Sequence, residues 1–542
     1  ILEEKLKQKK VRIFSDIHTS VLPDTEVVFN DSKSMKIKKI KDVEDNKELR
    51  VPAFDPTDLK IKWYNANLIK HNYNGKIFRI KTKAGRSVGI TSGHSVFILK
   101  EGNILDIPGD DVKIGDYLAI PKTSKWDKTI EDIDILDYIE RNESKGNRFS
   151  YDDNWIYYAR RKISPRRIKL NKEFGKLLGY YLAEGCAPRH INLTLGSHEK
   201  ELIEECCNCI RNVFPSNINT VNKKSAIDIQ FGSNILGKIF KKWFGKNARE
   251  KRIPDFVFSA NDEFKLAFLG AYINGDGNIE EKSTEIKTKH LRIRIKTASE
   301  KLASDLLYLF SQVNILAKFD HKEIIPARII AGNKQISEKS ISYVLRIQDI
   351  ESIKRIKEFL DRESSDKINN HLKNKKLQNQ ETVPLSLPSQ HINWNDIEVK
   401  KNTYLQEIKL QQKRKEKHVG INILKRDSIN INGITKKIIN GDLLFDPVVE
   451  IKEEEYHGEV YDFSVPEAEN FIGGFGGIML HNSGHCGRED LRDLIKMVRP
   501  QYIFPAHGDK HKLMGLAELA VEMGYSLGKT IHVMEDGKKI TI

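Results

Sequence analysis

The sequence predicts a multidomain protein in which an all-β unit is interrupted by a mixed α+β unit and flanked by α/β segments at both ends. Residues 21–122 contain alternating, strand-like runs separated by Asn-Gly or Gly-rich turns, and strand signals return at 447–463. From about residue 168 the apolar residues recur at helical spacing instead. Residues 483–542 mix helical and short strand patterns, and 542 residues are too many for one ordinary core.

The basic excess of the chain is concentrated in its interior. The net charge is +15, and because residues 1–19 contribute +2 and residues 483–542 contribute +1, +12 remains for the residues between them. Such an excess favours a polyanionic partner such as DNA or RNA, although a Lys-rich proteome would give the same balance.

The cysteine content indicates a reducing compartment. The five cysteines are an odd number, three of them lie within residues 206–209, and none of them has metal-site spacing. We therefore expect a cytoplasmic protein without a disulfide framework. No apolar run reaches the length of a membrane span, so we expect no membrane partner.

Two sites far apart in the sequence carry matching chemistry. Ser20 is a hydroxyl nucleophile at the upstream site, and Asn482 is followed by a second hydroxyl, Ser483. An Asn side-chain amide can attack its own backbone carbonyl and cleave the chain behind it. His481 is placed to assist that step.

The upstream hydroxyl needs help, because hydroxyls are weak nucleophiles at their ordinary pKa. The run 89–94 offers two helpers. The peptide bond before Ser20 is here called the upstream junction. We expect Thr91 to hydrogen-bond the carbonyl of this junction, and His94 to transfer a proton near neutral pH.

Taken together, these features resemble the inteins, which have a Hint-type splicing fold. The runs 112–117 and 460–465 are similar to framework motifs of that family, and Asp462 matches an acidic position used in the junction chemistry. Where many members have a His before Asn-Phe, this chain has Glu469. The resemblance implies that residues 20–482 excise themselves without a cofactor and join Thr19 to Ser483.

A second constellation consists of two short segments that resemble each other, 178–185 and 269–277. Each is helix-like and ends in a small residue, an acid and Gly. We expect Gly179 and Gly270 to let two helices approach closely. Glu184 and Asp276 would then lie side by side and hold divalent metals against scissile phosphates.

Residues 165–375 resemble the LAGLIDADG homing endonucleases, and 251–254 match a Lys-x-Ile-Pro element of that family. The resemblance implies a monomeric intein with pseudo-two-fold symmetry, which uses Mg²⁺ to cut a long, asymmetric site in double-stranded DNA. Lys251 is expected to stabilise phosphate charge or polarise water. The charges of Arg292, Arg294 and Lys296 fit a DNA-facing strand or an ordinary solvated one.

Joining the flanking segments gives a run that resembles the beta-CASP metallo-β-lactamase nucleases, close to ribonuclease J. The resemblance implies that His485 lies by a scissile phosphate in RNA and that His507 is a Zn²⁺ ligand. The main zinc cluster of that family is absent from the chain, so the flanks are expected to belong to a longer host protein.

Two alternatives stay open. The first acid of the paired segments is Glu rather than the commoner Asp, so the DNA domain could bind without cutting. The whole chain could also be an RNA-processing nuclease that retains its insertion.

The expected organisation follows the chain in order. The parts are a host segment (1–19), the first part of the splicing domain (20–125), the endonuclease (165–375), a connector or accessory region (376–440), the second part of the splicing domain (441–482) and a host segment (483–542).

Overall fold

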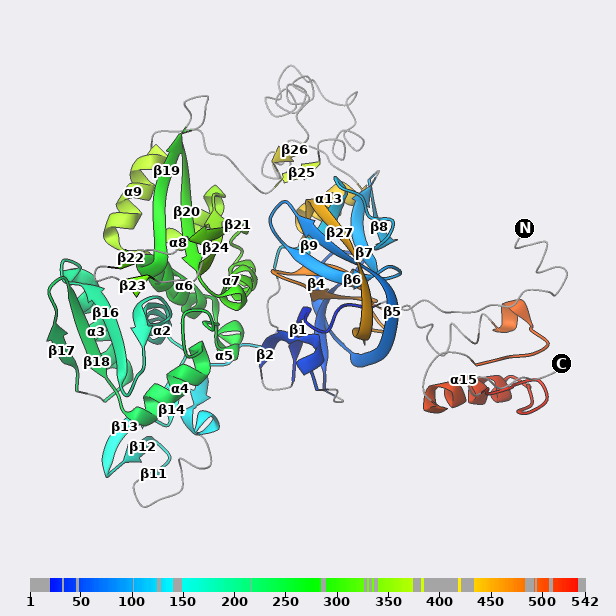
Figure 1. Cartoon of the computed structure of the whole chain (residues 1–542), viewed down its shortest axis with the longest axis horizontal. Coiled ribbons are helices and arrows are strands. Elements are labelled where there is room, and N and C mark those ends of the chain that lie inside the picture. Colours follow the sequence, from blue (N-terminus) through cyan, green and yellow to red (C-terminus); the bar gives the residue numbers. More distant parts are fainter. Residues whose placement is uncertain are drawn as a thin grey trace.

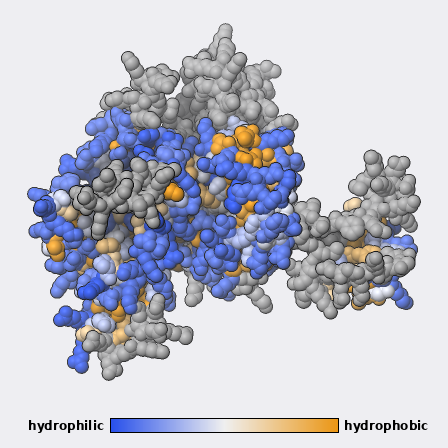
Figure 2. Space-filling view, in the orientation of Figure 1, coloured by the Kyte–Doolittle hydropathy of each residue, from blue (hydrophilic) through white to orange (hydrophobic). Residues whose placement is uncertain are grey.

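The computed structural model describes residues 20–31, 34–44, 48–100, 102–123, 128–139, 149–215, 217–283, 289–325, 329–330, 334–335, 340–373, 382–384, 418–420, 433–482, 492, 495–505 and 510–534. The face of the molecule in Figure 2 is mainly hydrophilic, with a few hydrophobic patches. Across these ranges, no helix has both the length and the apolar character needed to cross a membrane.

A twelve-stranded sheet combines the two strand-rich parts of the sequence (Figure 1). Its order is β4-β3-β1-β28-β29-β7-β9-β27-β5-β6, with β2 beside β1 and β8 beside β7. The strands are β1 Glu26–Asn30, β2 Met35–Lys39, β3 Arg50–Phe54, β4 Ile61–Asn65, β5 Asn67–Thr82, β6 Ser87–Thr91, β7 Ser95–Lys100, β8 Asn103–Pro108, β9 Tyr117–Pro121, β27 Leu443–Ser464, β28 Asn470–Gly473 and β29 Ile478–His481.

The long strand β27 connects the parts of this sheet. Its first five residues pair with β9, and most of its length pairs antiparallel with β5, from Val448 opposite Thr82 to Ser464 opposite Asn67. Both strands are rich in β-branched and aromatic residues, which favour extended backbone. We call this twelve-stranded unit the large sheet.

Between the two parts of the large sheet, the chain forms two halves with the same plan, here called the repeat region. Each half runs helix, two strands, helix, two main strands, helix. The two four-stranded sheets have matching orders, β15-β16-β18-β17 and β19-β20-β24-β21. The first half contains α2 Lys172–Glu184, β15 Gly185–Cys186, β16 Ile191–Gly196, α3 Lys200–Val213, β17 Asn219–Asn222, β18 Ala226–Phe231 and α4 Asn234–Phe244.

The second half contains α6 Asp262–Asp276, β19 Gly277–Ser283, β20 Lys289–Thr297, α7 Glu300–Gln312, β21 Ala317–Ile325, β24 Ser340–Ile347 and α8 Ile350–Lys357. The short helix α5 Asp255–Ser259 precedes it and α9 Arg362–Lys373 follows it. Corresponding elements therefore recur in corresponding places, as expected for two copies of one subdomain.

Helices α2 and α6 begin and end alike. An Asn at each N-cap, Asn171 or Asn261, accepts a hydrogen bond from the backbone N–H three residues later, at 3.0 and 2.9 Å. Such caps satisfy an otherwise unpaired backbone donor. Each helix ends in an acid followed by Gly, and the chain continues directly into a strand.

The close contact of α2 and α6 depends on a different set of small residues from the predicted one. A Cβ on Gly179 would lie 2.2 Å from the carbonyl oxygen of Phe268, so Gly179 is at the helix interface as predicted. The prediction for Gly270 was wrong, because its Cα faces the backbone of Phe359 instead. Gly275 takes that role on α6, where a Cβ would lie 2.5 Å from the Cβ of Ala183.

Smaller elements complete the described chain. Strands β10 Asp132–Asp134 and β14 Arg167–Lys169 pair with each other, and β11 Phe149–Tyr151, β12 Trp155–Tyr158 and β13 Arg161–Pro165 form a three-stranded sheet. Strand β22 Ile329–Ile330 pairs with β23 Lys334–Gln335, and β25 Thr382–Pro384 pairs with β26 His418–Gly420. Helix α13 Gly433–Asn440 leads into β27, and α15 Lys510–Glu522 lies near the C-terminal end of the sequence.

The cores are continuous between the two main regions. One cluster of buried residues lies within the large sheet. A second cluster holds the repeat-region helices together with Met35, Ile37, Ile472 and Met479 of the large sheet. The two regions therefore bury apolar surface against each other, which stabilises their contact in proportion to the area removed from water.

Candidate active sites

Ser20 is fully buried, where the start of the described chain lies between β27 and β6. The backbone of Val21 pairs with Tyr461 and with Ile90. The Ser20 N–H, which belongs to the upstream junction, donates to the Thr91 hydroxyl at 3.0 Å. That hydroxyl donates in turn to the carbonyl of Ser20 at 3.2 Å. Thr91 thus contacts the nitrogen of the junction peptide, while the junction carbonyl belongs to Thr19, outside the described residues.

His94 lies next to Thr91 in a dry part of the sheet. The backbone N–H of His94 donates to the Thr91 carbonyl at 3.1 Å. The His94 ring packs edge-on to Phe471, with ring centroids 6.5 Å apart. Neither ring nitrogen has a hydrogen-bond partner among the described residues. Burial, and then the nearby His481, lower the pKa of His94 to about 3, so the ring is neutral at physiological pH.

The downstream residues are held at the end of the β28–β29 hairpin. The Nδ1 of His481 lies 2.7 Å from the carbonyl oxygen of Asn482. This carbonyl belongs to the Asn482–Ser483 peptide bond, which would break at the downstream junction. When Nδ1 carries the proton, His481 donates a hydrogen bond to that carbonyl and polarises it. The ring of His481 packs against Phe97, with centroids 5.5 Å apart.

The Asn482 side chain is fixed by two backbone groups. In the amide orientation that matches donors with acceptors, Nδ2 donates to the carbonyl of Glu469 at 3.2 Å, and Oδ1 accepts from the N–H of Val465 at 2.9 Å. The N–H of Asn482 also donates to the Glu469 carbonyl, at 3.1 Å. Glu469 has a positive φ of 52°, and it contributes this carbonyl rather than a side chain.

Asp462 is buried on β27, directly after Tyr461, whose backbone pairs with Val21. Its Oδ1 accepts from the N–H of Phe463 at 2.7 Å. The acid therefore lies one position from the strand pairing that holds the Ser20 segment. Ser483, the next nucleophile in the predicted scheme, lies outside the described residues.

The two predicted acids meet where α2 and α6 end. A Cβ on Gly275 would lie 3.5 Å from Cγ of Glu184, which places the end of α6 against that side chain. Burial, and then the negative charge of Asp276, raise the pKa of Glu184. Burial also raises the pKa of Asp276, although the Lys251 ammonium and the Tyr272 hydroxyl oppose the shift.

Lys251 completes this group of charges, here called the carboxylate site. Its Nζ donates to the carbonyl of Ala183, beside Glu184, at 2.9 Å. Burial lowers the pKa of Lys251, although Asp276 and Glu184 both oppose the shift. Among the described residues, no three His, Cys, Asp or Glu side chains cluster as a metal site. A cation at this site would therefore need further oxygen ligands from water or substrate.

The predicted DNA-facing charges on β20 have partners within the protein. Arg292 forms an ion pair with Glu280 at 2.7 Å, and Lys296 forms one with Glu323 at 2.7 Å. Arg294 lies 3.7 Å from the same Glu323. These pairs are partly exposed, so each is expected to contribute little to stability.

A comparison with protein families identifies the family to which the chain belongs. The model of the intein splicing domain family matches residues 27–482. The chain belongs to the inteins. A second model, the RNA specificity domain of Zn-dependent metallo-hydrolases, matches residues 479–534.

Curated relatives cover the intein and extend beyond it. The DNA-directed RNA polymerase subunit Rpo1C of Methanocaldococcus jannaschii is 26% identical over 455 residues, covering 79% of this chain and 48% of that protein. A DNA polymerase of Thermococcus kodakarensis is 24% identical over 604 residues, covering 91% of this chain and 33% of that protein. The chain thus spans less than half the length of these relatives.

Solved structures match parts of the intein. The transcription factor IIB Mvu mini-intein is 22% identical with a TM-score of 0.17, and covers 19% of this chain and 69% of its own. The N-terminal LAGLIDADG domain of DUF199/WhiA is 17% identical with a TM-score of 0.23, and covers 36% of this chain and 86% of its own.

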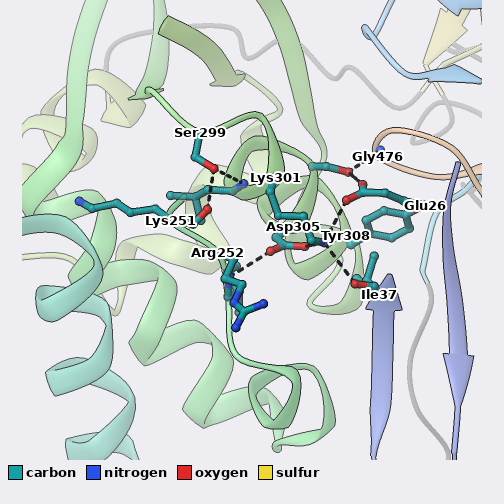
Figure 3. Close-up of polar contacts among 12 residues, drawn as sticks. Glu26, Ile37, Lys251, Arg252, Ser299, Lys301, Asp305, Tyr308 and Gly476 are labelled. Atoms are coloured by element: carbon teal, nitrogen blue, oxygen red, sulfur yellow. Dashed lines mark hydrogen bonds and ion pairs between the residues drawn. The ribbon is translucent and has the colours of Figure 1, made fainter. Parts of the chain in front are cut away.

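Helix α7 links the two parts of the intein through polar contacts (Figure 3). Lys301 forms ion pairs with Asp305 on its own helix and with Glu26 on β1, and it donates to the carbonyl of Ile37 at 3.3 Å. Asp305 accepts from the N–H of Ile253 at 3.0 Å. Burial raises the pKa of Asp305 to about 6, although Lys301 opposes the shift.

The same helix contacts the turn of the β28–β29 hairpin. The Ser304 hydroxyl donates to Glu26 and accepts from the N–H of Gly476 at 3.1 Å. The Tyr308 hydroxyl donates to the carbonyl of Gly474 at 2.7 Å. Helix α7 therefore supports the hairpin whose far end holds His481 and Asn482.

His71 is a site residue that the sequence analysis did not identify. Its Nε2 lies 3.3 Å from the Ser20 Oγ. His71 belongs to no motif, and an isolated His on an alternating strand gives no signal before the strand register is known. The predicted residues His485 and His507 lie outside the described residues.

Proposed function

We propose that the chain is a precursor from which residues 20–482 excise themselves by protein splicing, joining Thr19 to Ser483. The observation that supports this most directly is a connected set of groups between the two junctions. Ser20 is hydrogen-bonded to Thr91, Thr91 is hydrogen-bonded to the backbone of His94, and burial and then the charge of protonated His481 lower the pKa of His94. His481 in turn contacts the carbonyl of Asn482.

The splicing scheme needs only groups of the chain itself. Ser20 Oγ attacks the Thr19 carbonyl, so that an ester forms, the Thr19–Ser20 peptide bond breaks and the Ser20 nitrogen becomes an amine. Ser483 Oγ then takes the acyl group from Ser20. The Nδ2 of Asn482 attacks its own carbonyl carbon, which releases the nitrogen of Ser483. That amine finally takes the acyl group from its own hydroxyl.

His481 acts in the third step. Its hydrogen bond to the Asn482 carbonyl stabilises the negative charge that develops on this oxygen. The contacts of the Asn482 amide with Glu469 and Val465 restrict its rotation and keep it beside the carbonyl it attacks.

Intact-mass analysis of the expressed chain tests this proposal. We expect a joined product of residues 1–19 and 483–542, and a free insert that ends at Asn482. A variant with both Ser20→Ala and Asn482→Ala should remain full length. A parent chain that also stays full length would contradict splicing and favour a nuclease that retains its insertion.

We further propose that the excised intein is a site-specific endonuclease that cuts both strands of DNA. The matching strand orders of the two halves support a pseudo-two-fold frame, which suits a long duplex site. The paired acids lie at the C-terminal ends of α2 and α6, which contact each other, and Lys251 lies beside them.

The residues of the carboxylate site fit a divalent cation such as Mg²⁺. Mg²⁺ prefers oxygen ligands and is often bound by one or two carboxylates together with water and substrate phosphates. Glu184 and Asp276 would hold it, and burial raises the pKa of both carboxyl groups. When bound, the cation would stabilise charge on a scissile phosphate.

Lys251 has a separate role in this proposal. Its ammonium is fixed by the Ala183 carbonyl and lies in the field of both acids, so it can bind a phosphate oxygen or orient water. Cleavage of DNA that spans the uninterrupted host gene, with and without Mg²⁺, tests the activity. Binding without cleavage would favour a DNA-binding domain that has lost its activity.

We propose that the flanking segments belong to a zinc-dependent ribonuclease of the beta-CASP type, with cytoplasmic location and RNA as substrate. The match of residues 479–534 to the RNA specificity domain supports this. His485 would contact the scissile phosphate and His507 would bind zinc. Assay of the joined host protein on RNA, before and after splicing, tests this assignment.

A further inference from the structure

Ser20 needs a base before its hydroxyl can attack, and the structure restricts which group can serve. His94, the predicted helper, has no hydrogen-bond partner for either ring nitrogen among the described residues. Burial lowers its pKa to about 3, so it accepts protons poorly. The hydroxyl of Thr91 is already engaged with the N–H and the carbonyl of Ser20.

His71 contacts the reacting atom directly. Its Nε2 lies 3.3 Å from Ser20 Oγ, slightly longer than an ideal hydrogen bond and within the range that tightens when a reaction begins. The contact follows from strand register, because His71 pairs with Val460 on β27 and the next residue, Tyr461, pairs with Val21.

The surroundings of the two residues suit proton transfer. Ser20 is fully buried, whereas His71 is half-buried on β5. His71 therefore contacts a fully buried nucleophile while remaining partly exposed to solvent itself. An imidazole ring can both accept and donate a proton, which suits a base that must also act as an acid.

We propose that His71 is the general base and acid of the first acyl shift, an inference that rests on the proposed splicing function. Nε2 takes the proton from Ser20 Oγ as the bond from Oγ to the Thr19 carbonyl carbon forms. The imidazolium then gives that proton to the Ser20 nitrogen as its bond to the same carbon breaks. The nitrogen leaves as an amine, and His71 returns to its neutral form without any other reactant.

The test isolates the first step in the full-length chain. In a background with Asn482→Ala and Ser483→Ala, the later steps are blocked, and hydroxylamine releases residues 1–19 from the ester at Ser20. We expect His71→Ala to slow this release by about 100- to 10,000-fold, the usual contribution of a positioned acid–base group. His71→Gln should be equally slow, because an amide can keep a hydrogen bond but cannot take a proton.

Two controls separate chemistry from folding. His457→Ala removes an exposed histidine of β27, the strand that pairs with β5, and should release residues 1–19 at the parent rate. In a Ser20→Ala background, His71→Ala and His71→Gln should leave cleavage after Asn482 unchanged.

The outcomes are distinct. If the parent releases no hydroxamate, the proposed splicing function fails. If the parent reacts and His71→Ala or His71→Gln matches its rate, His71 is not the base. If His71→Ala also loses cleavage after Asn482, the variant is misfolded and the rate of His71→Gln decides the question.

Discussion

The residues at the two splicing junctions and the residues of the carboxylate site differ in their burial and in their contacts. Ser20, His94 and Asn482 are almost completely buried, and groups of the chain hydrogen-bond to Ser20 and to the Asn482 side chain. Glu184 and Asp276 are partly exposed, and their partial burial raises the pKa of both carboxyl groups. In the proposed scheme, the chain itself supplies the reacting groups of the first site, whereas the second site needs a cation and a substrate.

This difference predicts different sensitivities. A preorganised, dry site depends on fixed dipoles and loses activity when one contact moves. A site that lacks ligands depends on what it binds, so it responds to cation concentration and ionic strength. The predictions below test whether the two sites are as separate as this comparison suggests.

The largest effect should come from the carboxylates. We expect Glu184→Gln and Asp276→Asn each to reduce DNA cleavage by at least about 1,000-fold, or about 4 kcal/mol of transition-state stabilisation, because each removes a charged ligand of the cation. Excision of the intein should be unchanged. Single-turnover cleavage and intact mass measure the two activities on the same sample.

Glu263→Gln is the matched control, since Glu263 is exposed on the same helix as Asp276. It should cleave DNA like the parent. Cleavage that survives both carboxylate changes would place the metal elsewhere.

The pH response of the junction region should come next in size. The pKa of His94 is lowered from 6.5 to about 3 in the folded chain, so between these values the unfolded chain binds a proton that the folded chain does not. Stability from this group is complete above pH 6.5 and is lost as the pH falls, by up to about 1.4 kcal/mol per pH unit.

Hydrogen exchange of the β28 and β29 amides, corrected for intrinsic rates, measures this dependence. His94→Leu should flatten the slope between pH 6.5 and 4, whereas the exposed His457→Ala should leave it unchanged. An unaltered slope in His94→Leu would mean that other groups govern the acid sensitivity of this region.

A third prediction concerns the helix contact that brings the acids together. A Cβ on Gly179 would lie 2.2 Å from the backbone oxygen of Phe268, so Gly179→Ala must push α2 and α6 apart. We expect about 2–3 kcal/mol of destabilisation from this overpacking, more than the roughly 1 kcal/mol gained in helix propensity.

Gly237→Ala in α4 is the control, because its nearest atom would be the Arg189 oxygen at 3.2 Å. Urea unfolding followed by Trp243 fluorescence in the repeat region should shift to lower urea for Gly179→Ala only. Equal midpoints for the two variants would show that the helices can adjust.

The sequence was sufficient for features that depend on local pattern or short motifs. The strand-rich segments, the two helix ends and the pairing of acids all follow from periodicity and spacing, and the fold has them where expected. Register and long-range packing were not predictable in this way. His71 reaches Ser20 only because β5 pairs with β27, and Gly270 faces Phe359 rather than α2 because of how α6 is rotated.

The α7 contacts test the separation of the two sites most directly, although the expected effect is the smallest. Tyr308 donates to the Gly474 carbonyl in the turn of the hairpin that carries His481 and Asn482. Tyr308→Phe leaves this buried carbonyl without that donor, which costs about 1–2 kcal/mol. We expect cleavage after Asn482 to slow several-fold, measured in a Ser20→Ala background, although Tyr308 belongs to the repeat region.

Tyr180→Phe gives the comparison that decides this point. Tyr180 is equally buried, but its hydroxyl contacts Glu205 within the repeat region. It should leave cleavage after Asn482 unchanged while lowering the stability of the repeat region. If Tyr308→Phe also leaves that cleavage unchanged, the hairpin is rigid without α7 and the two sites are independent. If only Tyr308→Phe slows it, the repeat region is a structural component of the splicing site, and deleting this region would impair excision.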